Sequence, residues 1–126
     1  MRRPIWIPLL FTFVGCVEFV VGLSFIFLPN QIFALSQIAP IARLEYIQFP
    51  ALLIMVFGWM MWNVAARPKE NANLIPYISL FKVAFIGVVL FTWLTAGASP
   101  LWVIFTLFDI AYLIGFIFAY RVIKSS

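Results

Sequence analysis

The chain has 126 residues, of which 66% are hydrophobic and only 10% are charged. Soluble domains average about 45–50% apolar and about 25% charged residues, so this composition excludes an ordinary soluble domain and indicates an integral membrane protein. The formal net charge is +4. Its cations lie at the ends of apolar segments without interleaved aromatic residues, so we expect them to set membrane topology and predict no nucleic-acid partner.

The sequence contains no histidine and a single cysteine, Cys16. This inventory excludes a disulfide within one chain, imidazole metal sites, histidine-ligated haem and histidine-based catalytic triads. We therefore predict that the protein has no metal, needs no cofactor and is not an enzyme.

The first apolar segment covers residues 5–28. Spanning about 30 Å of hydrocarbon takes roughly 20 helical residues, so this segment is long enough to cross a bilayer. Residues 13–16 are similar to a lipoprotein cleavage site in which Cys16 would carry the lipid. Because the apolar run continues through Leu28, we favour a retained helix that ends at Pro29 and Asn30.

Three further apolar segments follow. They cover residues 44–66, 74–94 and 101–120, whereas residues 31–43 are too short to span and are expected to form an interfacial segment broken at Pro40. The connections are short, at the polar turn 67–71 and the small-residue turn 95–100. The sequence thus predicts an all-α fold, an antiparallel four-helix bundle that forms a single transmembrane domain over residues 1–126.

The distribution of lysine and arginine predicts the orientation of this bundle. With four spans, both termini and the second connection lie on one side, which holds most of the cations, whereas the other side has only Arg43. By the positive-inside rule, both termini are expected to be cytoplasmic. The cations on that side are Arg2, Arg3, Arg67, Lys69, Arg121 and Lys124.

Three ionisable residues, Glu18, Lys82 and Asp109, fall inside the predicted spans. An ionised side chain at the bilayer centre is unfavourable by about 2.5–3.5 kcal/mol on insertion scales. Counted from the cytoplasmic boundary, they lie roughly 21, 12 and 18 Å deep at 1.5 Å per residue. Because the lysine side chain extends several ångströms further, all three can meet at one level.

Two kinds of explanation remain open for these residues. In the architectural one, Lys82 snorkels to the cytoplasmic surface above protonated acids, or pairs with Asp109 to set helix register. In the functional one, Glu18, Lys82 and Asp109 form a proton- or cation-responsive site. Tyr112 lies on the Asp109 face of its helix and either donates to a carboxylate or packs.

Small residues predict where helices approach closely. Gly15 and Gly22 flank Glu18 on nearly the same face of the first segment and allow another helix to come near. A second stripe lies on a different face of the last segment from Asp109, and we expect it to dock within the chain or against a second protein. Its members are Ala111, Gly115 and Ala119.

The residues Arg43, Gly58, Lys82 and Asp109, together with the turn 66–71, give the chain a pattern that resembles small bacterial four-helix membrane proteins, loosely the DoxX-like group. The resemblance implies a bacterial inner-membrane, multi-pass protein. DoxX itself is associated with quinone-linked oxidation, but no redox ligand is present here. Glu18 is also similar in position to the glutamate in the first helix of small multidrug-resistance transporters, which lack counterparts of Lys82 and Asp109.

Two functions follow from these observations. The first is a non-enzymatic accessory or structural subunit of a larger membrane complex, with lipids and other membrane subunits or a second copy of the chain as partners. The alternative is a proton-coupled small-molecule transporter, or a binder of a lipophilic ligand, that uses buried Glu18 and Asp109. Convergence of the charged residues beside a cavity would favour the alternative.

Overall fold

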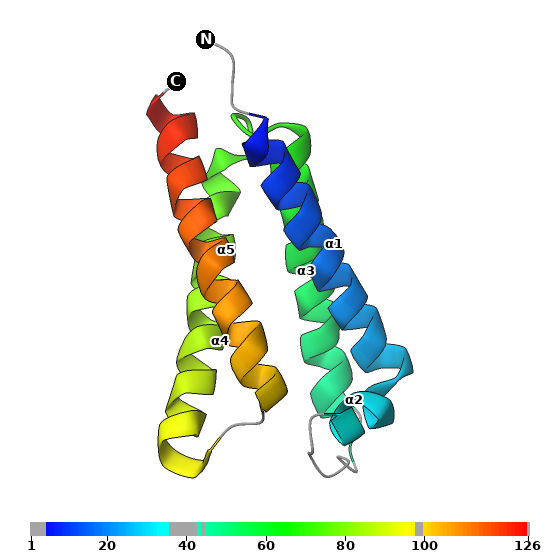
Figure 1. Cartoon of the computed structure of the whole chain (residues 1–126). Coiled ribbons are helices and arrows are strands. Elements are labelled where there is room, and N and C mark those ends of the chain that lie inside the picture. The colour runs from blue at the N-terminus through cyan, green and yellow to red at the C-terminus, as the bar shows by residue number, and fades with distance from the viewer. Residues whose placement is uncertain (1–4, 36–42, 44, 98–99, 126) are drawn as a thin grey trace.

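The computed structural model describes residues 5–35, 43, 45–97 and 100–125, and within these residues it contains helices and no strand. Four long α-helices form the body of the molecule, and neighbouring long helices run in opposite directions (Figure 1). In chain order the elements are α1 (Trp6–Phe27), α2 (Pro29–Leu35), α3 (Glu45–Ala66), the short 3-10 helix η1 (Ala72–Leu74), α4 (Ile75–Ala96) and α5 (Pro100–Ser125).

The all-α prediction is confirmed, with differences at the helix ends. The last helix continues through Ser125 rather than ending at residue 120, so Arg121 and Lys124 lie on its final turns. Pro29 begins a new short helix directly after α1, which its ring permits because the first-turn N–H has no helical partner. Residues 36–42 of the expected interfacial segment, and Arg2 and Arg3, lie outside the described residues.

All four long helices are long and apolar enough to cross a membrane. Large apolar side chains also cover much of their outer surface; Val20, Phe91 and Leu94, for example, are 64%, 70% and 81% exposed. In water such a surface would be a large unsatisfied apolar area, whereas lipid tails can cover it. The arrangement is that of a multi-pass membrane protein.

The four helices pack most extensively as two pairs, α1 with α3 and α4 with α5. The α1–α3 crossing depends on glycine: a Cβ atom built on Gly15 would lie 2.4 Å from the Trp62 side chain and 3.0 Å from the Gly58 carbonyl oxygen. The Trp62 indole N–H also donates to the Thr12 carbonyl across this crossing, at 3.3 Å. These contacts hold α1 and α3 as one unit.

The two pairs join at the end of the bundle that carries both termini (Figure 1). A continuous buried core, which we call the closed half, fills the space between them there. Within this core, Phe11 of α1 stacks on Phe116 of α5, with ring centroids 4.8 Å apart. Its buried members are Ile7, Phe11, Val14, Met61, Val64, Ala72, Ile75, Ile78, Phe116, Ala119 and Ile123.

Candidate ligand-binding site

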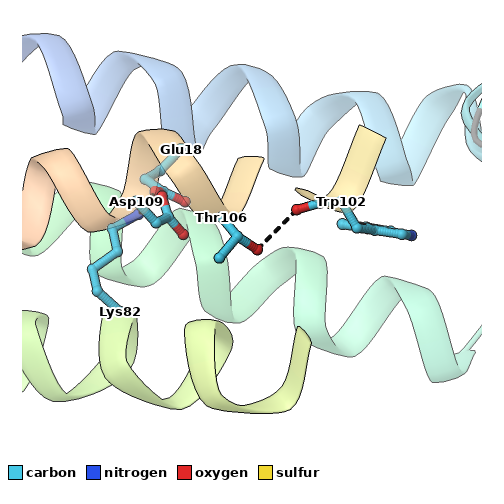
Figure 2. A network of polar contacts seen from close by, with 5 residues as sticks. All are labelled: Glu18, Lys82, Trp102, Thr106 and Asp109. Atoms are coloured by element: carbon cyan, nitrogen blue, oxygen red, sulfur yellow. Dashed lines mark hydrogen bonds and ion pairs between the residues drawn. The ribbon is translucent and has the colours of Figure 1, made fainter. Parts of the chain in front are cut away.

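Three charged side chains from three different helices meet in the middle of the bundle (Figure 2). The Lys82 ammonium on α4 donates to Glu18 Oε1 on α1, and also to Asp109 Oδ1 on α5 at 3.0 Å. Since Lys82 and Glu18 belong to different helix pairs, their ion pair is a polar link between the pairs. We call these three residues the charge triad.

The charge triad is buried, but unevenly. The side chain of Lys82 is 1% exposed, that of Glu18 is 8% and that of Asp109 is 15%. Lys82 therefore points into the bundle and does not extend toward the membrane surface, as a snorkelling lysine would. Without its two carboxylate partners, the buried ammonium would be strongly unfavourable in these apolar surroundings.

Aromatic rings complete the surroundings of the lysine. Its Nζ atom lies 5.6 Å from the ring centroid of Phe81 and 5.6 Å from that of Tyr112, within the range of cation–π attraction. Tyr112 thus meets Lys82 with its ring, and within the described residues its hydroxyl makes no hydrogen bond to Glu18 or Asp109. The Tyr112 ring also stacks on Phe108, with centroids 6.3 Å apart.

An apolar cleft of about 780 Å³ lies between the two helix pairs, beside the charge triad. This volume is within the range of about 300–1,000 Å³ that is typical of small-molecule sites. Glu18, Asp109 and Tyr112 line the cleft near the closed half, whereas Lys82 is not among the lining residues. All four long helices contribute to the walls, which are otherwise apolar and rich in phenylalanine.

The far end of the cleft is bounded by a cluster of aromatic rings around Trp102. Its indole stacks on Phe25 of α1 at 5.7 Å between centroids, and lies 6.1 Å from the ring of Phe85 on α4. Trp102 and Asp109 are seven residues apart on α5, which corresponds to about 10 Å along the helix. The cleft thus has a carboxylate end and an aromatic end about 10 Å apart.

The glycines of α1 both lie against α3, where they permit close packing next to Glu18. A Cβ atom on Gly22 would lie 2.4 Å from Met55 Cγ and 2.8 Å from the Ala51 carbonyl oxygen, as Gly15 would meet Trp62 and Gly58. The close approach of α3 places Pro50, Ala51 and Ile54 at the cleft wall.

The small residues of α5 do not form one contact surface. A Cβ atom on Gly115 would lie 2.9 Å from the Leu10 side chain of α1, and Ala119 is fully buried in the closed half. Ala111, in contrast, is exposed. Two of the three therefore pack within the chain, and one lies on the outer surface.

Sequence reasoning did not assign Trp102, Phe105 or Phe85 to the site. A signal was present, because Trp102, Phe105, Asp109 and Tyr112 recur at intervals of three or four residues and therefore share one face of α5. Thr106 lies beside this face, fixed by a hydrogen bond from its hydroxyl to the Trp102 carbonyl at 2.8 Å (Figure 2).

Comparison of the chain with models of protein families, with curated proteins and with solved structures found no match. The resemblance to DoxX-like proteins therefore stays a prediction. Among the described residues, no group of three or more histidine, cysteine, aspartate or glutamate side chains could hold a metal ion.

Proposed function

We propose that the protein crosses the bacterial inner membrane four times, with both termini in the cytoplasm. The apolar outer surface supports the membrane location. The charges support the orientation, because Arg67, Lys69, Arg121 and Lys124 lie at the end where α3 and α5 finish, and Arg43 lies near the start of α3. The choice of the inner membrane depends on the resemblance to DoxX-like proteins.

We further propose that the protein binds a lipophilic small molecule in the cleft between its helix pairs. One observation carries this proposal: the charge triad converges directly beside an apolar cavity of ligand size. A purely architectural triad would need no cavity, since its role would be complete in a filled core. Few polar groups at one end of a largely apolar pocket are typical of sites that orient a ligand.

Binding is favoured over transport because the closed half fills the bundle between the charge triad and the end that carries both termini. Phe11, Phe116 and Ile78 are fully buried there, so the cleft does not continue past the charge triad toward the termini. The accessory-subunit hypothesis stays a prediction that rests on size and composition, and it does not require the cleft. An enzymatic role is not proposed, because the residues that line the cleft include no serine, threonine or cysteine nucleophile.

Quenching of tryptophan fluorescence by 4-bromobiphenyl tests the proposal in protein reconstituted into lipid nanodiscs. This neutral probe quenches tryptophans that it contacts, both in a binding site and by partition into lipid. A bound probe should add a saturable component from Trp102, which lines the cleft. That component should disappear in Trp102→Phe and remain in Trp93→Phe, because Trp93 is 55% exposed on the outer surface.

A matched pair of substitutions tests whether the cleft itself holds the probe. Ala84 lines the cleft on α4, so Ala84→Trp should occupy the space and abolish the saturable component. Ala111 is exposed and does not line the cleft, so Ala111→Trp should leave it unchanged. Quenching that rises linearly with probe in every variant would show partition alone and would overturn the proposal.

A further inference from the structure

The charge triad contains two carboxylates and one ammonium, so its formal charges do not cancel. With both acids ionised, one negative charge is left in an apolar environment, where an uncompensated charge is strongly unfavourable. The other charged side chains that the structure describes, Arg43, Glu45, Arg67, Lys69, Glu70, Arg121 and Lys124, lie at or beyond the ends of the long helices. A balancing charge must therefore arrive as a proton or with a ligand.

The geometry decides which sign of charge the cleft presents. Glu18 and Asp109 line the cleft, whereas Lys82 does not line it and is only 1% exposed. Figure 2 shows the lysine reaching the two carboxylates from α4, with the acids between it and the helices α1 and α5. A molecule in the cleft thus meets the two acidic residues and not the lysine. An anionic ligand would be repelled there, and a cationic one attracted.

The aromatic walls favour the same sign. The face of an aromatic ring carries negative potential and attracts cations. Phe13, Phe105, Phe108 and Tyr112 line the cleft, and Phe108 and Tyr112 lie within one helical turn of Asp109 on α5. The Lys82 ammonium already lies 5.6 Å from each of two ring centroids, so this part of the bundle accommodates a cation against aromatic groups.

We propose that the ligand of the cleft is a lipophilic cation, namely an ammonium group joined to an apolar body about 10 Å long. The ammonium pairs with Glu18 and Asp109, and the body lies along the apolar walls toward Trp102. This inference rests on the proposed function, since it specifies which lipophilic molecules the same cleft selects. A free amine fits better than the ammonium of a phospholipid headgroup, whose adjoining phosphate would enter the cleft beside two carboxylates.

Two isosteric probes test the charge preference directly. One is (4-phenylbenzyl)trimethylammonium, and the other is the neutral hydrocarbon in which a carbon atom replaces the nitrogen. Binding is measured to the full-length protein in nanodiscs of a neutral galactolipid, with empty nanodiscs as the correction for partition. We expect the cation to bind at least about tenfold more tightly than its neutral isostere, because its positive charge is attracted to the nearby carboxylates in surroundings that screen charge weakly.

The ratio of the two dissociation constants should fall toward one in Glu18→Gln and in Asp109→Asn, since each removes one carboxylate. Equal affinities in the unsubstituted protein would overturn the cation proposal and leave the binding function standing. Saturable binding of neither probe, and none of 4-bromobiphenyl, would overturn both. A preference that survives both substitutions would show that other groups select the cation, and would also overturn the proposal.

A final experiment distinguishes a free amine from the ammonium group of a phospholipid headgroup as the ligand. Phosphatidylethanolamine is added to the galactolipid nanodiscs at increasing fractions, and the cation affinity is measured again. We expect no competition, because the headgroup phosphate excludes this lipid from the cleft. Progressive weakening of probe binding would overturn the assignment to a free amine and identify the lipid headgroup as the occupant.

Discussion

The closed half and the cleft are built from the same four helices and have similar apolar compositions, yet one is filled and the other is open. Phenylalanine is abundant in both. In the closed half, Phe11 and Phe116 stack across the gap at 4.8 Å, whereas at the cleft Phe13, Phe105 and Phe108 line an unfilled space. Apolar composition therefore does not decide where membrane helices close on one another.

The difference follows from the nature of the solvent. Lipid tails are as apolar as leucine, so burying an apolar side chain against another helix gains little over contact with lipid. Shape and polar pairing then decide where helices associate. The charge triad lies at the boundary between the two halves, and it is the place where an interhelical contact has a large energetic advantage over lipid.

Removal of the triad lysine should have the largest effect on this arrangement. Lys82→Met leaves two buried carboxylates without their common partner, and loss of one member of a buried ion pair typically costs about 3–5 kcal/mol. We expect a loss of that size in the free energy of unfolding, measured by denaturant titration in mixed micelles. Full recovery of stability in the triple variant Lys82→Met, Glu18→Gln, Asp109→Asn would show that unpaired charge is the cause.

The exposed ion pair between Arg67 and Glu70 is the control for that prediction. Its N–O distance is 3.2 Å and both side chains are about 70% exposed, at 72% and 68%. Exposed pairs contribute little, so Arg67→Met should change stability by less than about 1 kcal/mol. Equal effects of Lys82→Met and Arg67→Met would contradict a structural role for the triad.

The second largest effect should distinguish the two halves directly. Phe116→Ala removes a fully buried ring of the closed half and should destabilise the protein by about 3 kcal/mol, because it leaves a cavity. Phe105→Ala removes a ring that already faces the cleft, and should cost about 1 kcal/mol. Denaturant titration in the same mixed micelles measures both. Similar losses of stability in Phe116→Ala and Phe105→Ala would mean that neighbouring side chains fill the cleft around Phe105.

Much of this fold could be predicted from the sequence because hydrocarbon imposes strong local rules. Apolar runs of about 20 residues and the short polar turn after Ala66 were sufficient to locate four helices. Where the rules were weaker, the prediction was less complete: α1 ends before Pro29 as expected, but the short helix α2 that begins at Pro29 was not predicted there. Arg121 was expected beyond the last helix and lies within it, because a helix can continue into the headgroup region.

The meeting of Glu18, Lys82 and Asp109 was foreseeable from their depths, whereas the cleft was not. Depth along a helix depends only on residue count, so it can be read from one sequence. Whether the two helix pairs pack against each other or leave a cleft beside such a triad depends on how side chains from four helices fit together. Phe105 in the cleft and Phe116 in the core are the same residue type on one helix, and only their neighbours distinguish them.

Steric fit also distinguishes two glycines and gives a smaller expected effect. Gly22→Ala places a Cβ atom 2.8 Å from the Ala51 carbonyl oxygen at the α1–α3 crossing, and such overpacking typically costs about 1–3 kcal/mol. Gly87 on α4 has no atom within 4 Å of an added Cβ. Gly87→Ala should therefore leave stability unchanged or raise it by up to about 1 kcal/mol through helix propensity. Thermal unfolding of the two variants side by side measures the difference, and an equal response would contradict close packing at Gly22.

The smallest expected effect concerns one hydrogen bond within the α1–α3 pair. Trp62→Phe retains an aromatic ring against Phe19, with which the indole stacks at 4.4 Å, but removes the N–H that donates to the Thr12 carbonyl. Interhelical hydrogen bonds in membranes contribute about 0.6 kcal/mol on average, so we expect a loss of about 0.5–1.5 kcal/mol when the smaller ring is included.

Trp59 is 61% exposed on the same helix, and Trp59→Phe should change stability by less than about 0.5 kcal/mol. Chemical denaturation of both variants compares them. A larger loss for Trp59→Phe would show that the outer surface of α3, and not its crossing with α1, holds the pair together.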